Sequence, residues 1–346
     1  MWMDSGQGLW WSVCAAACAS SWLLVRAAIV YAYRRGMLDA PGQRRSHSIP
    51  TPRGGGIGPV VITLIGGTWA LLMTPPPLPR ALVGTWAAGI AVVSAVGWWD
   101  DHHDLPAWPR LLAQSLVTGT FCSALIAVTG LSWWWLPFGV VAGTGSINLH
   151  NFMDGIDGLL AQQMIFFGIV VTILGLQAGQ PGIAWAAAIM ASACVGFWLH
   201  NRSPARIFMG DVGSGTMGLL VFMFIALLSA RELRAVWPML AACSGFLIDA
   251  GLTLLWRMVR GRRWYTAHRE HLYQWLVRCG WTHTRTGSLY MVWNLLTLPA
   301  AWVAWHWPAY APGIIALVYL CGAVLWRQAR MACLHSVSRR AVHELA

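Results

Sequence analysis

The most unusual stretch of this chain is NLHNFMDGIDGLL (residues 148–160), which places polar side chains between two long apolar runs. Its four amide and acid residues follow one another at three-residue spacing: Asn148, Asn151, Asp154 and Asp157. Amide and carboxylate oxygens are hard ligands that suit Mg²⁺. If the stretch is helical, the last three form a tilted polar stripe, because each step of three residues advances the helix by about 300°. Gly155 and Gly158 would let a ligand approach closely or the helix unwind.

Two further groups of acids lie at the ends of apolar runs. In DDHHD, Asp100, Asp101 and Asp104 would share one face of a helix that Pro106 then ends. Adjacent carboxylates repel unless a cation lies between them, so this pattern is typical of magnesium–phosphate sites, including the DDxxD motif of isoprenyl transferases. In FMGDVGSG, Asp211 precedes an apolar run. It is either a helix N-cap or part of a helix N-terminus that binds a phosphate or a metal-bound anion.

The longest hydrophilic stretch, residues 257–287, adds cationic and aromatic side chains. Within RRWYTAHREHLYQ (262–274), the groups that can donate to phosphates are Arg262, Arg263, His268, Arg269 and His271. Trp264 and Tyr265 offer flat faces on which a nucleotide base could stack. The two histidines have the spacing of a zinc pair, but no cysteine or third histidine is suitably spaced to complete a zinc site.

Composition indicates which elements position these groups. Of the 346 residues, 57% are hydrophobic and only 10% are charged, whereas soluble domains have roughly a quarter charged residues. Apolar stretches long enough to cross about 30 Å of hydrocarbon recur along the whole chain. We expect eleven spans, at about 10–33, 54–74, 80–99, 110–129, 131–147, 159–177, 182–199, 214–230, 236–256, 288–306 and 311–327. The chain is therefore predicted to be all-α, a polytopic transmembrane helix bundle that forms one domain over residues 1–346.

The arginines predict the orientation, since the chain contains no lysine. With the N-terminus outside, one set of alternate loops carries most arginines, and the other holds only Arg80, Arg231 and Arg234. The positive-inside rule then places the arginine-rich loops and the C-terminus in the cytoplasm. The loops expected to form an active site on that face lie near 34–53, 100–109, 148–158, 200–213 and 257–287. Acids and arginines at one membrane surface indicate phosphate chemistry with a divalent cation, and the scattered arginines argue against nucleic-acid binding.

Together these segments resemble the polyprenyl-phosphate N-acetylhexosamine-1-phosphate transferases, the WecA/MraY family. Five segments carry the resemblance, in order: SHSIPTPRGGGIG (46–58), DDHHDLP (100–106), NLHNFMDGIDGL (148–159), FMGDVGSG (208–215) and AHREHLYQ (267–274). Eleven spans with the N-terminus outside are more similar to the WecA branch than to the ten-span MraY branch. The segment HREHLYQ resembles the corresponding loop of O-antigen initiators of the WbpL kind more closely than that of WecA or MraY. This departure leaves the identity of the sugar open, but not the reaction class.

The resemblance implies a reaction at the cytoplasmic face of the bacterial inner membrane. A UDP-N-acetylhexosamine would bind with Mg²⁺, or alternatively Mn²⁺, on its pyrophosphate. The phosphate of undecaprenyl phosphate would attack the phosphorus next to the sugar, and UMP would leave. The lipid-linked product would begin a surface polysaccharide such as the O-antigen of lipopolysaccharide. The resemblance also suggests a homodimer.

The same resemblance assigns roles to residues. Asn151 and Asp211 would bind the metal, and Asp100 and Asp101 would orient or deprotonate the lipid phosphate. The substrates would be contacted by Arg53, Asp104, Asn148, His268, Arg269 and His271. Asp154 and Asp157 would contact the nucleotide-sugar or support the site. The second pKa of a phosphate monoester is about 6, so the lipid phosphate needs little help from a base near pH 7.

Three other functions fit parts of the sequence. An integral-membrane prenyltransferase would use DDxxD, but should carry a second acidic motif of the same type later in the chain. A CDP-alcohol phosphotransferase needs Ala-Arg shortly after Asp-Gly, whereas Asp154-Gly155 is followed by Ile156-Asp157. An ion-coupled transporter should carry acids near the middle of its spans, where only Asp249 lies.

Overall fold

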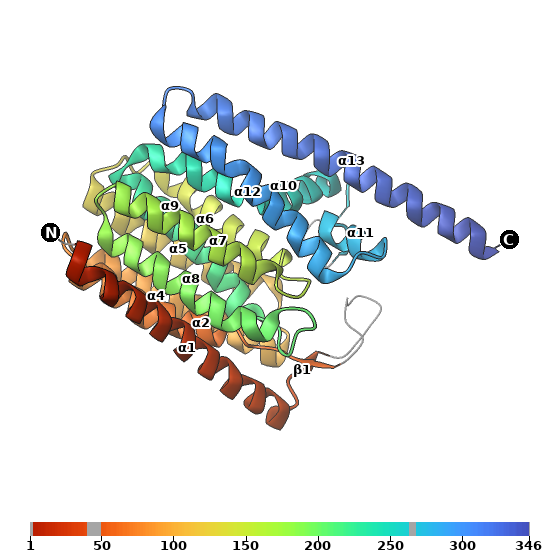
Figure 1. Ribbon diagram of the computed structural model, residues 1–346, viewed down its shortest axis with the longest axis horizontal. Coiled ribbons are helices and arrows are strands. Elements are labelled where there is room, and N and C mark those ends of the chain that lie inside the picture. The colour runs from red at the N-terminus through yellow and green to blue at the C-terminus, as the bar shows by residue number, and fades with distance from the viewer. Residues whose placement is uncertain (1–2, 40–49, 263–267, 346) are drawn as a thin grey trace.

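The computed structural model describes residues 3–39, 50–262 and 268–345, most of which are helical (Figure 1). The first helices are α1 (Met3–Arg35), α2 (Ile57–Ile62), the π-helical turn η1 (Thr63–Gly67), α3 (Thr68–Met73), α4 (Arg80–His103), α5 (Ala107–Thr129) and α6 (Trp135–Phe152). Then follow α7 (Leu159–Gln177), α8 (Pro181–Asn201), α9 (Asp211–Arg231), the 3₁₀ turn η2 (Leu233–Ala235), α10 (Val236–Val259), α11 (Leu272–Arg278), α12 (His283–His306) and α13 (Ala311–Leu345).

Each predicted span coincides with a helix, or for 54–74 with the continuous segment α2–η1–α3. Eight helices of the described chain are long and apolar enough to cross a membrane, and Ile57–Met73 is a shorter apolar helix. The all-α polytopic class is therefore confirmed. The total of eleven spans and the orientation of the two termini stay predictions.

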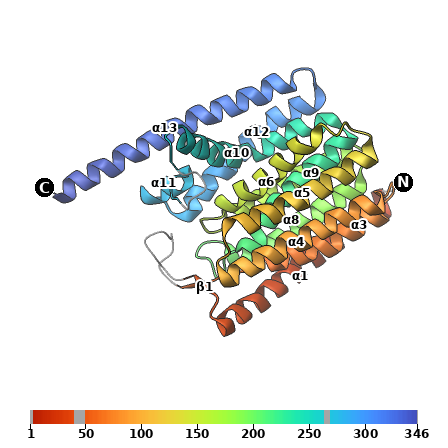
Figure 2. The ribbon, with the colours of Figure 1, turned by 180° about the vertical axis from the view of Figure 1, so that it is seen from behind.

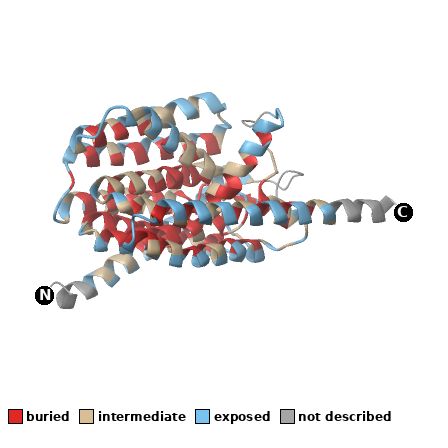
Figure 3. Cartoon of the chain, turned by 90° about the horizontal axis from the view of Figure 1, so that it is seen from above, coloured by how far each residue is buried: buried red, intermediate tan, exposed pale blue. Residues whose placement is uncertain are grey.

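The apolar helices pack side by side around a buried centre. α8 packs against α1 and α7, α9 packs against α4 and α6, and α10 packs against α12 and α13. Buried residues gather in the inner helices, while α13 carries many exposed residues along its described part (Figure 3). α7, α8 and α9 are apolar on nearly all sides, as expected for helices that other helices surround.

A short strand pair is present that the sequence did not predict. β1 (Leu38–Asp39) pairs antiparallel with β2 (Thr51–Pro52). The Phe208 N–H donates to the Pro52 carbonyl oxygen at 2.8 Å, which ties β2 to the segment before α9. Arg53, the next residue along the chain, is thereby held near the start of α9. Residues 46–49 of the first family segment lie outside the described residues.

Candidate active site

The three groups of acids meet at one end of the bundle. Asp101 lies in the last turn of α4 and Asn151 in the last turn of α6, and Asp211 is the first residue of α9. They surround a cavity of about 260 Å³ at the end that carries β1 and α11 (Figures 1 and 2). The polar and charged residues that line it are Asp39, Arg53, Asp101, Asn151, Asp154, Asn201, Asp211, Ser214 and Gln274. Segments far apart in the sequence thus form one acidic site.

Asp101 holds the start of α9 in place. Its side chain is buried, and its two oxygens accept hydrogen bonds from the Asp211 N–H at 3.0 Å and the Val212 N–H at 3.1 Å. The first N–H groups of a helix have no partner within the helix, so a carboxylate of α4 caps α9. Gly210 has φ +74°, and a Cβ there would lie 2.6 Å from Asp101 Oδ2. Asp211 is therefore not the cap, and its own carboxylate faces the cavity.

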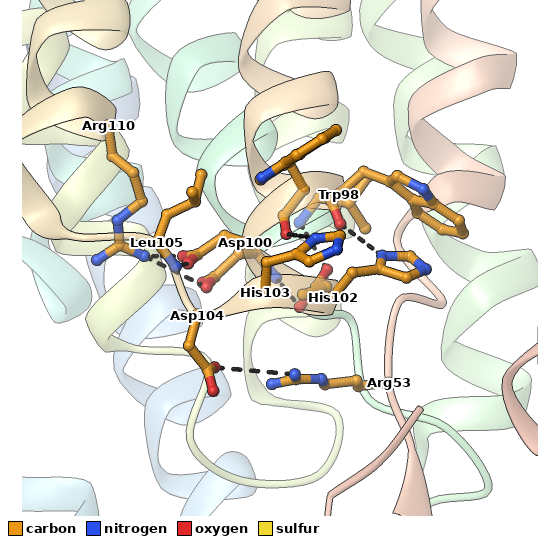
Figure 4. A network of polar contacts seen from close by, with 12 residues as sticks. Arg53, Trp98, Asp100, His102, His103, Asp104, Leu105 and Arg110 are labelled. Atoms are coloured by element: carbon orange, nitrogen blue, oxygen red, sulfur yellow. Dashed lines mark hydrogen bonds and ion pairs between the residues drawn. The ribbon is translucent and has the colours of Figure 1, made fainter. Parts of the chain in front are cut away.

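Arg110 joins two of the acid groups, and Figure 4 shows its contact with Asp100. Its Nη1 donates to Asp100 Oδ2 and lies 3.4 Å from Asp211 Oδ2. The other oxygen of Asp100 accepts from the Leu105 N–H at 2.5 Å, in the turn between α4 and α5. From the sequence, Arg110 was counted only as a charge of a cytoplasmic loop. The available signal was its position, because Pro106 breaks the helix and the chain must turn back past the acids.

α6 ends before the polar ladder does. Its last residue is Phe152, and the chain up to α7 forms a loop. The prediction of a helical stripe through Asp154 and Asp157 is therefore wrong. The loop packs closely on α11. A Cβ on Gly155 would lie 2.0 Å from the hydroxyl oxygen of Tyr273, and this hydroxyl donates to the Phe152 carbonyl oxygen at the end of α6, at 3.0 Å.

The two asparagines of the ladder point to different partners. Asn151 Nδ2 donates to Asp211 Oδ1 at 2.5 Å, so the two predicted metal ligands are in direct contact. Asn148 Nδ2 donates to Gln114 Oε1 at 2.7 Å and to the Thr144 carbonyl oxygen at 2.8 Å. Asn148 does not line the acidic cavity and instead links α6 to α5.

Asp154 lies on the loop after α6, at the wall of the cavity. Burial, together with the negative charges of Asp211, Asp101 and Asp157, raises the pKa of the Asp154 carboxyl well above its usual value. Carboxylates that raise one another's pKa in this way favour a cation between them.

The chemistry of these donors fits a magnesium ion. Mg²⁺ usually takes one or two carboxylates together with phosphate oxygens and water. Asp154, Asp211 and the carboxamide of Asn151 line one cavity and supply such oxygens. In the described part of the chain, no three His, Cys, Asp or Glu side chains are arranged to hold a metal by themselves. Asp154, Asp211 and Asn151 are the residues that would hold the ion.

Asp157 is bound by protein groups. Its Oδ2 lies 3.1 Å from His283 Nδ1 at the start of α12 and accepts from the Ala205 N–H at 3.2 Å. Burial raises the pKa of Asp157, but the hydrogen bond and charge of His283 and the donors of Ser203 and Ala205 outweigh it and lower the pKa. Of the two roles open to it, substrate contact or support of the site, these contacts favour support.

A fall in pH should lower the stability of the folded protein through protonation of Asp157. Because its pKa is lower in the folded chain than the unfolded value of about 3.9, its stabilisation is present above that value. It is lost as the pH falls through the lower folded value. Asp157→Asn should lower the unfolding temperature near pH 6 by roughly 2–4 °C and flatten its decrease below about pH 4. Thermal unfolding in detergent from pH 6 to pH 3 tests this, and an unchanged acid profile in the variant would contradict it.

Asp104 lies apart from Asp100 and Asp101. It follows the last residue of α4 with φ +48°, a left-handed conformation that aspartate tolerates better than most residues. The prediction that the three acids share one helical face is therefore wrong. The Asp104 side chain is 93% exposed and lies 3.9 Å from Arg53, outside the cavity lining (Figure 4).

The loop that precedes α11 lies beside the cavity. The rings of His268 and His271 have centroids 6.3 Å and 6.1 Å from that of Phe152, which follows Asn151 in the chain. Burial, and then the positive charges of His271 and Arg257, lower the pKa of His268 to about 4. Its imidazole is therefore neutral at pH 7.

The remaining residues of this loop have different places. Arg269, the residue after His268 in the chain, is half-buried. Glu270 forms ion pairs with Arg257, Arg262 and Arg330, which fix this end of the loop. None of the three predicted residues of the loop lines the acidic cavity, although Gln274 of α11 does. Arg263, Trp264 and Tyr265 lie outside the described residues.

Asp249 anchors α11 from within the bundle. Its buried carboxylate accepts hydrogen bonds from the Leu272 N–H at 2.7 Å and the Tyr273 N–H at 3.3 Å, the first residues of α11. It also accepts from the Tyr290 hydroxyl at 2.6 Å and from Trp326 Nε1 at 3.0 Å. Asp249 lies near the middle of α10, and its structural role was not indicated by the sequence.

A glycine sets the distance between α4 and α9. A Cβ on Gly97 would lie 2.3 Å from the Asp211 carbonyl oxygen, which is backbone and cannot move without its helix. We expect Gly97→Ala to lower the free energy of unfolding by about 1–3 kcal/mol. The control is Gly84→Ala in the same helix, where a Cβ meets nothing within 4 Å. Chemical unfolding in detergent measures both, and equal stability of the two variants would contradict this account of the contact.

Comparison with known proteins agrees with this site. The family model described as glycosyl transferase family 4 matches residues 83–229, which include the acids of α4, the ladder and the start of α9. A phospho-N-acetylmuramoyl-pentapeptide-transferase of Synechococcus sp. (strain JA-2-3B'a(2-13)) is 31% identical over 292 residues, 74% of this chain and 80% of the relative.

Two further relatives match over different lengths. A transferase with the same name from Synechococcus sp. (strain RCC307) is 32% identical over 243 residues, and the match spans 63% of each chain. The decaprenyl-phosphate N-acetylglucosaminephosphotransferase of Mycobacterium tuberculosis is 29% identical over 314 residues, 76% of this chain and 74% of the relative. The chain thus belongs to the polyprenyl-phosphate N-acetylhexosamine-1-phosphate transferases of glycosyl transferase family 4.

Proposed function

We propose that the protein transfers an N-acetylhexosamine-1-phosphate from a UDP-sugar to undecaprenyl phosphate and releases UMP. The observation that carries this proposal is the meeting of Asp101, Asn151, Asp154 and Asp211 around one cavity, next to the Asp100–Arg110 pair. Such a site suits a diphosphate with a divalent cation. The names of the relatives, which include a polyprenyl phosphate and an N-acetylhexosamine phosphate, support the same substrate classes.

The reaction we propose is an in-line displacement at the phosphorus next to the sugar. An oxygen of the lipid phosphate forms the new P–O bond, and the bond to the UMP oxygen breaks, so one diphosphate replaces another. Catalysis then consists mainly of placing the two phosphates and compensating their charge. A Mg²⁺ ion held by Asn151 and Asp211, with Asp154 nearby, would supply charge neutralisation on the pyrophosphate.

Three side chains can bind the phosphates or hold the site in position. Arg110 stands between Asp100 and Asp211 with about a third of its side chain exposed, so it can contact an entering phosphate without leaving Asp100. Asp101 keeps the start of α9 in position. His268, which is neutral before an anion binds, can become a phosphate donor when the negative charge of a substrate raises its pKa.

The prenyltransferase alternative loses its main support in the structure. A DDxxD diphosphate site needs its first and last acids on one face, but Asp104 is exposed and turned toward Arg53. Asp100 and Asp101 instead belong to a site completed by α6 and α9.

The location we propose is the cytoplasmic face of a bacterial inner membrane. The acidic cavity lies at the end of the bundle where the arginine-rich loops gather, which the positive-inside rule places in the cytoplasm. There the nucleotide-sugar would arrive from solution and the lipid phosphate from the membrane. The product would start a lipid-linked surface polysaccharide such as O-antigen.

The experiment measures UMP release by the purified protein with undecaprenyl phosphate and a panel of UDP-N-acetylhexosamines. We expect release with at least one sugar, dependent on both Mg²⁺ and the lipid. Reactions without lipid distinguish transfer from hydrolysis of the nucleotide-sugar. Folded protein that releases no UMP with any member of the panel would contradict the proposal.

A further inference from the structure

A second cavity lies next to β2 and is distinct from the acidic cavity. It has a volume of about 550 Å³ and is lined by α1, the segment around β2 and the end of α8 with its following loop. Its lining residues are Trp22, Arg26, Ile29, Tyr33, Pro50, Thr51, Pro52, His200, Ala205 and Arg206. None of them lines the acidic cavity, although Pro52 directly precedes Arg53, which does.

Two guanidinium groups give this cavity a positive charge. Arg26 of α1 and Arg206 of the loop after α8 are exposed, and neither forms an ion pair with any acid of the described chain. Arg26 lies over the ring of Trp22, 5.7 Å from its centroid, and is held close to the wall. Among the described residues that line the cavity there is no carboxylate, in contrast to the acidic cavity.

The cavity wall also contains an incomplete hydrogen-bond network. His200 is 4% exposed, and its Nε2 lies 3.2 Å from the Trp22 carbonyl oxygen, to which it donates. Its Nδ1 is buried and has no hydrogen-bond partner among the described residues. A buried polar nitrogen without a partner is rare in native proteins and often marks a place where another molecule binds.

The position of the cavity suggests a lipid as its occupant. α1 is on the outside of the bundle (Figure 1), and Leu23, Val30 and Tyr33 on it are exposed, as expected of a helix that faces lipid. Arg26 lies within this apolar span, nearer its β1 end, where a long arginine side chain can reach the headgroup region. Tyr33, near the β1 end of this span, is a residue type that is common at the membrane–water interface.

From these observations we propose that this cavity binds the headgroup phosphate of an anionic phospholipid. Arg26 and Arg206 would donate to the phosphate oxygens in charge-assisted hydrogen bonds, which are stronger than neutral ones. The two guanidinium groups repel the ammonium of a zwitterionic headgroup, so the site selects for net negative charge.

The test is native mass spectrometry of the detergent-purified full chain with phosphatidylglycerol, phosphatidylcholine or inorganic phosphate. We expect one phosphatidylglycerol to bind more tightly than phosphatidylcholine and to stay bound in millimolar phosphate. In Arg26→Gln/Arg206→Gln its affinity should fall roughly fivefold for each arginine and so roughly 25-fold in total. Both side chains are exposed, so the double variant should keep the unfolding temperature of the unaltered protein.

The matched control is Arg80→Gln/Arg202→Gln, which removes two exposed arginines that do not line the cavity. It should bind phosphatidylglycerol as the unaltered protein does. An equal loss in both double variants would show general charge attraction and overturn the site. Unchanged binding in Arg26→Gln/Arg206→Gln would overturn it as well, and displacement by inorganic phosphate would identify a free-phosphate site instead of a lipid site. All these readouts are independent of sugar-phosphate transfer.

Discussion

Asp211→Asn should lower the rate of transfer by about 10²–10³-fold, because it removes one negative charge from the centre of the acidic cavity. Asp211 contacts both Asn151 and Arg110, so it links the proposed metal ligands to the proposed phosphate-binding arginine. Asparagine has nearly the same shape and leaves the backbone bonds to Asp101 in place. The fold should therefore survive while the charge that holds a cation is lost.

The dependence on metal concentration makes this prediction specific. If Asp211 holds Mg²⁺, the variant should need more Mg²⁺ to reach half its maximal rate, in addition to having a lower maximum. UMP release titrated with Mg²⁺ measures both. Glu232→Gln, a similar change at the far end of α9, is the control and should leave the rate and the Mg²⁺ requirement unchanged. Normal turnover of Asp211→Asn at ordinary Mg²⁺ would show that Asp211 does not hold the metal and is only the first residue of α9.

The spans could be predicted because their signal is local. A run of apolar residues long enough to cross a membrane becomes a helix whatever its neighbours are, and α7 has the predicted bounds 159–177. The helix ends at the site could not be predicted in this way. α4 continues through the polar residues up to His103, since the N-terminus of α9 and Arg110 satisfy its two buried acids.

The candidate site was predictable in its composition but not in its contacts. The spacing of Asn151, Asp154 and Asp157 fits a helix stripe as well as it fits a helix end followed by a loop, and only packing against Tyr273 decides between them. The pairing of Asp249 with the start of α11 joins segments that share no sequence pattern. Contacts of this kind form only in the folded chain, so no local sequence motif predicts them.

The role of Asp100 can be tested by removing its carboxylate and its partner separately. Both oxygens already accept hydrogen bonds, from the Leu105 N–H and Arg110, so the carboxylate holds Arg110 and the turn after α4 in place. We therefore expect that Asp100 positions Arg110 and is not an essential base. Asp100→Asn should lower the rate at pH 7 by roughly 10–100-fold but keep a measurable rate that rises as the lipid phosphate ionises, near its second pKa of about 6.

A double-mutant cycle separates the two roles most sharply. If Asp100 acts only through Arg110, Asp100→Asn/Arg110→Gln should lose little more activity than Arg110→Gln alone, because residues that act as one unit are not additive. A general base would add its own contribution, about 10²–10⁴-fold, on top of the arginine's at every pH. UMP release at saturating Mg²⁺ from pH 5.5 to 9 gives the rates for all four proteins. Complete inactivity of Asp100→Asn across that range, with lipid binding intact, would show that the carboxylate itself takes the proton.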